Sequence, residues 1–383
     1  MSDVFHRKEL AHELALKLMD PPLASAVRSG LFLAAPRRTG KSTFLVADLV
    51  PALENANARV IYVDLWRDID REPADVIIEV IAAALSKEEG ALARLTDVLR
   101  KIDSVSAGGL LSVSVKGPDE TQAYVSMTDA LIALSDEIEQ VIVLIIDEAQ
   151  HAITTKAGSK SLFSLKAARD ALNINRTHGL RIVATGSNRD KLSMLRSSKD
   201  QAFFGAPLTT FPPLNEEYVR WFIEGRQLSD VLEVDVVTQW FIYAGHRPEI
   251  LSAAADAVLY EIGADPTTIP ERLKLAIEEE VRAVDEAQMR VVRSLTALQS
   301  AVLREMASSG TGYAPFEQAT MDRYQVTLHQ IAPSSTVLPN DTNVQSALAS
   351  LQKRGLVWRA ARGVYALEDS RLATLMQLDG MIQ

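Results

Sequence analysis

The stretch Leu31-Phe-Leu-Ala-Ala-Pro-Arg-Arg-Thr-Gly-Lys-Ser42 decides the fold of this chain. Its apolar start is typical of a buried strand, and it runs into a segment, Thr43 to Leu53, with the pattern of a helix. From Ala35 onward it fits the spacing of a phosphate-binding loop, except that alanine replaces the first glycine. A strand, a loop and a helix N-terminus in this order let backbone N–H groups surround a polyphosphate.

The polar positions of this loop predict contacts with nucleotide phosphates. Gly40 lets the backbone approach the phosphates, Lys41 reaches the β and γ oxygens, and the Ser42 hydroxyl binds Mg²⁺. A Gly-Lys-Ser triplet alone also occurs in ordinary loops, so the strand and the helix around it carry the prediction. The residues expected to surround the polyphosphate are Ala35, Pro36, Arg37, Arg38, Thr39, Gly40, Lys41, Ser42 and Thr43.

A second motif, Leu144-Ile-Ile-Asp-Glu148, ends an apolar run that starts at Val141. Asp147 is expected to bind the nucleotide and to hold Mg²⁺ at the carboxyl edge of a sheet, and Glu148 to polarise the attacking water. Paired acids at a strand end are otherwise solvated turn residues. Two such motifs in this order predict a nucleoside triphosphate site with Lys41 and Glu148 as catalytic residues.

Apolar runs separated by helical stretches predict a doubly wound parallel α/β domain over residues 1–214. The expected strands cover residues 31–35, 59–64, 141–147 and 181–185. Small polar and apolar residues alternate near 104–116 around Gly108-Gly109, which predicts a hairpin insertion. The Pro212-Pro213 pair ends this region.

Helices dominate the remaining chain and predict a helical lid over residues 215–285. Helices followed by two short strands predict a winged helix-turn-helix over residues 286–383. The net charge of −10 argues against binding nucleic acid with the whole surface, but residues 282–383 hold ten basic and nine acidic residues. Contact with double-stranded DNA is therefore expected from this module alone, with docking to a protein as the alternative. The DNA-binding candidates are Lys353, Arg354, Arg359 and Arg362.

Composition excludes several other classes of protein. The chain has no cysteine, which excludes disulfides, thiolate zinc sites and cysteine nucleophiles. The six histidines show no metal-binding spacing, and His151 is expected to have a capping or surface role or, alternatively, to sense the nucleotide. The charged start and the lack of a long apolar run predict a cytoplasmic protein without a membrane segment.

The phosphate-binding loop, the tetrad Asp147-Glu-Ala-Gln150 and the segment Ala184-Thr-Gly-Ser-Asn188 resemble the AAA+ and STAND-type P-loop ATPases. The likeness is closest to the archaeal ATPase group and the replication-initiator clade, which carry a C-terminal winged helix. This resemblance implies ATP, Mg²⁺ and hydrolysis to ADP and phosphate. It implies that Asn188 positions the attacking water, with Thr185 or Ser187 as alternatives in another register.

In the segment Gly245-His-Arg-Pro-Glu249, the resemblance implies that Arg247 or His246 contacts the nucleotide from the lid; a structural turn is the alternative. An arginine finger would have to lie at the end of the sheet that carries the site, and the candidates there are Arg176, Arg189 and Arg196. The segment Phe203-Phe-Gly-Ala206 stands where the archaeal group often has a Gly-Arg pair.

Two functions remain open. One is an ATPase whose nucleotide state controls association with DNA or a partner, as a homo-oligomer or with a partner protein. The other is a STAND-like switch with slow hydrolysis, acting in signalling such as mobile-element control or phage defence.

Overall fold

The computed structural model describes residues 4–88, 90–91, 110–115, 121–175, 178–187, 189–197, 201–262, 265–361, 363–369 and 371–382. The chain divides into two compact units, Met1–Pro213 and Leu214–Gln383. The finer division of the second unit into a lid and a winged helix stays a prediction.

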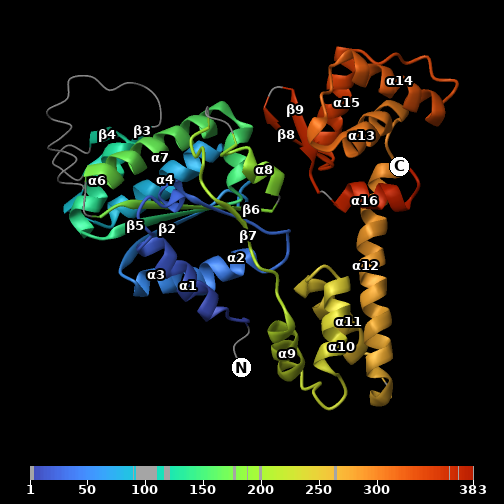
Figure 1. The fold of residues 1–383 in the computed structure, drawn as a ribbon, viewed down its shortest axis with the longest axis horizontal. Helices are drawn as coiled ribbons and strands as arrows, with labels where there is room; N and C mark the ends of the chain where they lie inside the picture. Colours follow the sequence, from blue (N-terminus) through green and yellow to red (C-terminus); the bar gives the residue numbers. More distant parts are fainter. Residues whose placement is uncertain are drawn as a thin grey trace. The chain divides into compact units, whose positions relative to one another are not determined.

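The first unit is built on a five-stranded sheet in the order β2-β5-β6-β1-β7, with every pairing parallel. Its strands are β1 (Leu31–Ala34), β2 (Ala58–Asp64), β5 (Val141–Asp147), β6 (Leu180–Gly186) and β7 (Leu208–Thr210). The predicted parallel α/β fold is confirmed (Figure 1). The edge strand β7 was not predicted, because it is short and its two threonines are exposed.

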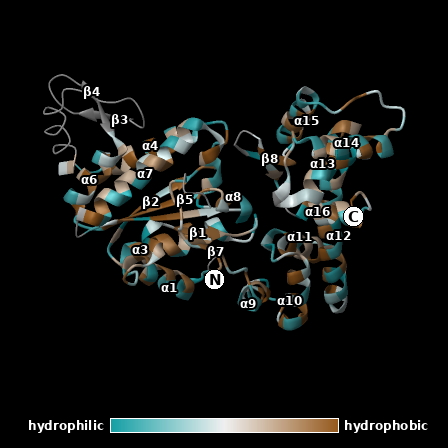
Figure 2. Ribbon diagram, turned by 45° about the horizontal axis from the view of Figure 1, so that its top comes forward, coloured by the Kyte–Doolittle hydropathy of each residue, from teal (hydrophilic) through white to brown (hydrophobic). Residues whose placement is uncertain are grey.

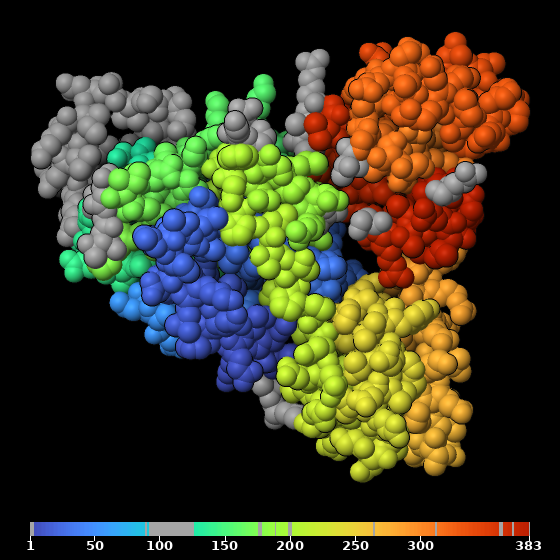
Figure 3. All heavy atoms as spheres, viewed as in Figure 1, coloured from blue at the N-terminus to red at the C-terminus, as the bar shows by residue number. Residues whose placement is uncertain are grey.

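Helices cover both faces of the sheet, and the side chains of each strand alternate between them (Figures 1 and 2). One face packs against α1 (Lys8–Met19), α2 (Lys41–Phe44), a π-helical turn (Leu45–Leu49) and α3 (Val50–Asn55). The other face packs against α4 (Pro73–Ser86), α6 (Met127–Ile138), α7 (Lys156–Asn175) and α8 (Arg189–Ser193). Helix α1, in dark blue, lies at the surface of the unit (Figure 3). Burial on both faces explains why the strands read as continuous apolar runs.

A hairpin follows α4, but the predicted position was wrong. Strand β3 (Leu110–Val115) pairs antiparallel with β4 (Thr121–Ser126), with Leu110 opposite Ser126. The alternating residues 110–115 form one strand whose partner lies further along the chain, so Gly108-Gly109 is not the turn between the strands. Residues 104–109 lie outside the described part of the chain. The Ser126 side chain then accepts a hydrogen bond from the Asp129 N–H at 3.1 Å, which caps α6.

The second unit is helical except for one hairpin in its described part. Its first helices are α9 (Glu216–Gly225), α10 (Val234–Tyr243), α11 (Pro248–Leu259) and α12 (Ile269–Arg293), with a short 3₁₀ turn at Pro266–Thr268. Aromatic side chains join α9 to α10, with the rings of Tyr218 and Phe241 stacked 5.2 Å apart. Helix α12 buries a stripe of apolar residues at helical spacing, from Leu273 through Ile277 to Val281.

Four helices and an antiparallel hairpin form most of the rest of this unit in its described part. They are α13 (Ala297–Ser309), α14 (Gln318–Ile331), α15 (Asp341–Lys353), β8 (Val357–Ala361) and β9 (Val364–Leu367), followed by α16 (Arg371–Leu378). Thr296 and Gln299 form a capping box that starts α13. This order of elements is the one on which the winged-helix prediction rests. Among the described residues, no helix is both long and apolar enough to cross a bilayer.

Candidate active site

The loop after β1 begins beside the end of β6 and ends at a helix. Ala35 donates its N–H to the carbonyl oxygen of Gly186 at 3.0 Å, because β1 and β6 are neighbours. Gly40 has a φ of +81°, a left-handed conformation that glycine adopts without steric cost. The helix begins at Lys41 rather than at the predicted Thr43. The predicted sequence of strand, loop and helix is therefore present.

The other residues of the loop lie mostly at the surface. Pro36, Arg37 and Arg38 are exposed, and Arg38 has a φ of +62°. Thr39 is buried, and its hydroxyl donates to the carbonyl oxygen of Pro36 at 2.7 Å. This internal bond stabilises the turn that precedes Gly40.

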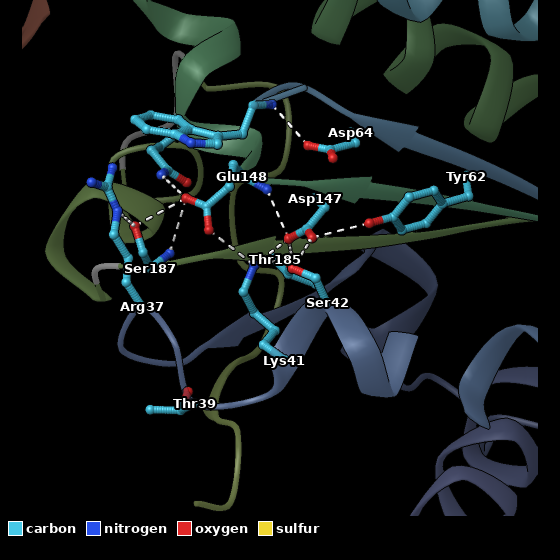
Figure 4. A network of polar contacts seen from close by, with 12 residues as sticks. Arg37, Thr39, Lys41, Ser42, Tyr62, Asp64, Asp147, Glu148, Thr185 and Ser187 are labelled. Atoms are coloured by element: carbon cyan, nitrogen blue, oxygen red, sulfur yellow. Dashed lines mark hydrogen bonds and ion pairs between the residues drawn. The ribbon is translucent and has the colours of Figure 1, made fainter. Parts of the chain in front are cut away.

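The Lys41 ammonium lies at the centre of a buried polar network (Figure 4). The side chain is only 5% exposed, and it donates to the Asp147 carboxylate, to Glu148 Oε1 at 3.0 Å and to Thr185 Oγ1 at 3.1 Å. An ammonium has three N–H donors, so these acceptors account for all of them. A phosphate oxygen that binds Lys41 must therefore replace one of these contacts.

Asp147 accepts hydrogen bonds on both carboxylate oxygens and is 1% exposed. Oδ2 accepts from Ser42 Oγ at 2.7 Å and from the Tyr62 hydroxyl at 3.1 Å, and Oδ1 accepts from Lys41 and Thr185. Burial raises the pKa of Asp147, but the charge and hydrogen bond of Lys41 outweigh it and hold this pKa below its usual value. Burial and the nearby carboxylates raise the pKa of Tyr62, which keeps its hydroxyl a donor.

Glu148 has a φ of +53° and turns its carboxylate toward the loops at the ends of β1 and β6. Its Oε2 accepts from Gln150 Nε2 at 2.6 Å, from Ser187 Oγ at 2.9 Å and from Ser187 N at 3.3 Å. Burial raises the pKa of Glu148, but the positive charge of Lys41 and the Gln150 amide hold it below its usual value. The carboxylate is thus ionised and able to accept a proton.

Strand pairing brings the ends of β5 and β6 together at this edge. Ile146 is opposite Ala184, so Thr185 and Ser187 lie beside the two acids. Thr185 contacts Lys41 and Asp147, and Ser187 contacts Glu148. Asn188, the predicted water-positioning residue, lies outside the described residues. Both of its predicted alternatives, Thr185 and Ser187, have side chains in the site.

The oxygens of Ser42 and Asp147 fit the donors that Mg²⁺ prefers. A hydroxyl and a carboxylate lie 2.7 Å apart at the start of a helix and the end of a strand. No group of three or more histidine, aspartate or glutamate side chains that could hold a metal occurs in the described part of the chain. Mg²⁺ is commonly held by one or two protein ligands together with substrate phosphates, so this pair suffices.

Trp66 contacts both Arg37 and His151 beside the site, and the Trp66 and His151 rings are tilted by 55° to each other. The guanidinium of Arg37 lies 4.3 Å from the centre of the Trp66 ring, which in turn lies 4.7 Å from the His151 ring. Arg37 Nε also donates to Ser187 Oγ at 3.4 Å. His151 belongs to the 3₁₀ turn Ala149–Thr154 directly after Glu148. The contacts among Arg37, Trp66 and His151 therefore join the phosphate-binding loop to the segments that follow β2 and β5.

Arg247 and His246 belong to the second unit. Gly245 and His246 have positive φ values of +73° and +55° and form the turn between α10 and α11. His246 Nδ1 lies 2.8 Å from the carbonyl oxygen of Leu214, and Arg247 pairs with Glu249 at 2.8 Å. Within this unit the segment is a structural turn, and its contact with nucleotide stays a prediction.

The candidate arginine fingers have different surroundings. Arg189 donates to Thr210 Oγ1 at 3.0 Å and thus ties α8 to β7. Arg196 is half-buried after α8, and Arg176 lies outside the described residues. Neither of the two described arginines can be identified as an arginine finger from these contacts.

The described DNA-binding candidates lie at the end of α15 and in the hairpin. Lys353 is exposed, and Arg354 donates to Ser294 Oγ at 3.0 Å. The guanidinium of Arg359 lies 5.7 Å from the centre of the Tyr365 ring. Arg362 lies outside the described residues.

Sequence reasoning missed two residues of this site. Tyr62 reaches Asp147 from β2, and the sequence does not say that β2 is the neighbour of β5. Trp66 lies two residues after the end of β2, so its place close behind a predicted strand was a usable signal. Gln150 was noted only as part of a motif, and its contact with Glu148 was not foreseen.

Comparison with known proteins agrees with this geometry. Residues 27–194 match the family model of an AAA domain. The chain is similar in fold to the Aeropyrum pernix ORC2 protein in its ADP form, with a TM-score of 0.52 at 15% identity, covering 100% of this chain and 95% of that one. The ADPNP-ADP complexes of the same protein give a TM-score of 0.46 at 16% identity, covering 99% of this chain and 95% of that one. The Aeropyrum pernix ORC1 protein in complex with DNA gives a TM-score of 0.39 at 17% identity, covering 99% of this chain and 94% of that one.

No curated protein sequence matches the chain. The match to an AAA domain over residues 27–194, the parallel sheet and the buried Lys41 network together indicate a P-loop ATPase domain in the first unit. Its fold is similar to that of the Aeropyrum pernix ORC2 protein.

Proposed function

We propose that this protein binds ATP with Mg²⁺, hydrolyses it, and uses its nucleotide state to control association with DNA or a partner protein. The observation that carries the proposal is the buried cluster in which Lys41 contacts Asp147 and Glu148 while Ser42 contacts Asp147. A lysine, a hydroxyl and two carboxylates at the end of a phosphate-binding loop provide the groups that phosphoryl transfer to water requires.

Each residue has a distinct role in this reaction. The loop amides and Lys41 hold the phosphate oxygens, and Ser42 and Asp147 hold Mg²⁺, which neutralises phosphate charge when bound. Glu148 accepts a proton from the attacking water. Thr185 forms hydrogen bonds with both Lys41 and Asp147 and keeps these two side chains in place. ATP rather than GTP follows from the family resemblance.

Steady-state release of phosphate tests the catalytic part of the proposal. The wild-type protein should turn over ATP, and chelation of Mg²⁺ should stop it. Glu148→Gln should keep binding of a non-hydrolysable ATP analogue while kcat falls at least ~100-fold, since general bases contribute at least this much. Turnover that survives in both Lys41→Ala and Glu148→Gln would contradict the assignment.

The DNA part rests on the cations at the end of α15 and in the hairpin. Lys353 and Arg359 would contact phosphates, and two or three such contacts give only a modest salt dependence for one copy. Tight retention would then need several copies of the chain on one duplex. Retention of double-stranded DNA should fall with salt and in Arg359→Ala. If retention changes neither with salt nor in Arg359→Ala, the module that contains α15 and the hairpin should be reassigned to protein docking.

The observation that favours a slow switch is the segment Phe203-Phe-Gly-Ala206, which carries no arginine. In such a switch, purified protein would retain nucleotide and show negligible turnover with or without DNA. Multi-turnover hydrolysis that DNA stimulates would favour the first function instead.

A further inference from the structure

The two oxygens of Glu148 have different surroundings. Oε2 accepts three hydrogen bonds, from the Gln150 amide at 2.6 Å, the Ser187 hydroxyl at 2.9 Å and the Ser187 N–H at 3.3 Å. Oε1 accepts from Lys41 at 3.0 Å. Oε2 is therefore held by groups outside the predicted phosphate contacts, and Oε1 is held by a side chain that must also bind phosphate.

Gln150 is fixed in one orientation. Its side chain is fully buried, and its Nε2 faces the carboxylate because two facing oxygens would repel each other. Its Oε1 then points toward Gly186, where a Cβ atom would lie 2.3 Å from that oxygen. Glycine at this position leaves the space that the amide oxygen occupies.

Ser187 reaches the same oxygen from the other side. It follows β6 directly, and its hydroxyl also accepts a hydrogen bond from Arg37 Nε at 3.4 Å. Arg37 is stacked on Trp66, so the serine is held from the phosphate-binding loop as well as from the sheet. Side chains that are tied by several such contacts keep a functional group in one geometry.

We propose that Gln150 and Ser187 are positioning residues, which hold Oε2 of Glu148 so that Oε1 takes the proton of the attacking water. This inference rests on the proposed ATP hydrolysis. Phosphate binding replaces one of the three contacts of Lys41, because the three donors of the ammonium are already in use, and in this proposal the replaced contact is the one to Oε1. The water oxygen then bonds to the γ-phosphorus, the bond from phosphorus to the leaving ADP oxygen breaks, and the water proton moves to Oε1.

The test separates positioning from nucleotide binding. Gln150→Met keeps the volume but removes the amide donor, and Ser187→Ala removes the hydroxyl donor. Each should lower kcat about tenfold, a part of the usual contribution of a general base, while KM for ATP stays within about twofold. The Kd of a non-hydrolysable ATP analogue should also stay unchanged, and Ser187→Thr, which keeps a hydroxyl, should restore kcat.

Matched controls are available in the same unit. Gln140→Met removes an exposed amide bond to Asn57 of 2.7 Å, and Ser193→Ala removes an exposed bond to Asp190 of 2.7 Å. Both should leave kcat and the melting temperature unchanged.

Two results would overturn the inference. The first is an unchanged kcat in both Gln150→Met and Ser187→Ala. The second is a fall of kcat accompanied by equal losses of analogue affinity and thermal stability, which marks a structural role. The proposed ATP hydrolysis is tested separately, by whether the wild-type protein turns over ATP and Glu148→Gln abolishes that turnover. A failure of the proposed function can therefore be distinguished from a failure of the positioning role.

Discussion

Replacing Lys41 by methionine should destabilise the first unit in the absence of nucleotide. The change keeps an apolar chain of similar length but leaves Asp147 and Glu148 buried without their shared cation. Removing one partner of a buried ion pair costs about 3 kcal/mol or more, because the remaining charge is neither solvated nor paired. For domains of ~150–250 residues each kcal/mol lowers the melting temperature by about 2–4 °C, so we expect a fall of about 6–12 °C.

Calorimetry of the nucleotide-free protein measures this effect. The control is Lys17→Met, which removes an exposed ion pair with Glu13 on α1 and should leave the melting temperature almost unchanged. A second change, Asp147→Asn in the Lys41→Met protein, removes one of the two stranded charges and should recover about half of the loss.

The result that would refute this reasoning is a melting temperature for Lys41→Met equal to that of Lys17→Met. A double variant that is less stable than Lys41→Met alone would also count against it. Either outcome would mean that the two carboxylates are solvated or protonated and that Lys41 does not hold them.

Three further changes test other parts of the first unit. Gly186→Ala should lower turnover about tenfold with analogue binding kept, because its Cβ would lie 2.3 Å from Gln150 Oε1; phosphate release and analogue titration measure this. Asp48→Ala should loosen the N-terminal segment, since Asp48 accepts from Arg7 N at 3.0 Å and lies 2.7 Å from His6 Nδ1; hydrogen exchange at Arg7 should accelerate about tenfold or more. Phe32→Ala removes a fully buried ring that packs 5.6 Å from Phe203 and should cost about 3–5 kcal/mol in urea unfolding; a cost below about 1 kcal/mol would contradict the packing.

Local pattern was enough for the elements that carry the site. The strands at 31–34 and 141–147 are predicted because parallel strands buried on both faces are apolar throughout. Lys41 and Asp147 are predicted because each follows or ends such a strand in a recognisable motif. The hairpin was misplaced because alternation predicts a strand but does not name its partner.

What the sequence by itself determined is the chemistry at the carboxyl edge of the sheet: a lysine and a hydroxyl after one strand and two acids after another. Only the tertiary structure decided which side chains complete it. The order β2-β5-β6-β1 brings Tyr62 to Asp147 and Ser187 to Glu148 from the two strands on either side of β5. Such contacts depend on strand order and register, which are set by long-range packing and not by the residues next to each motif.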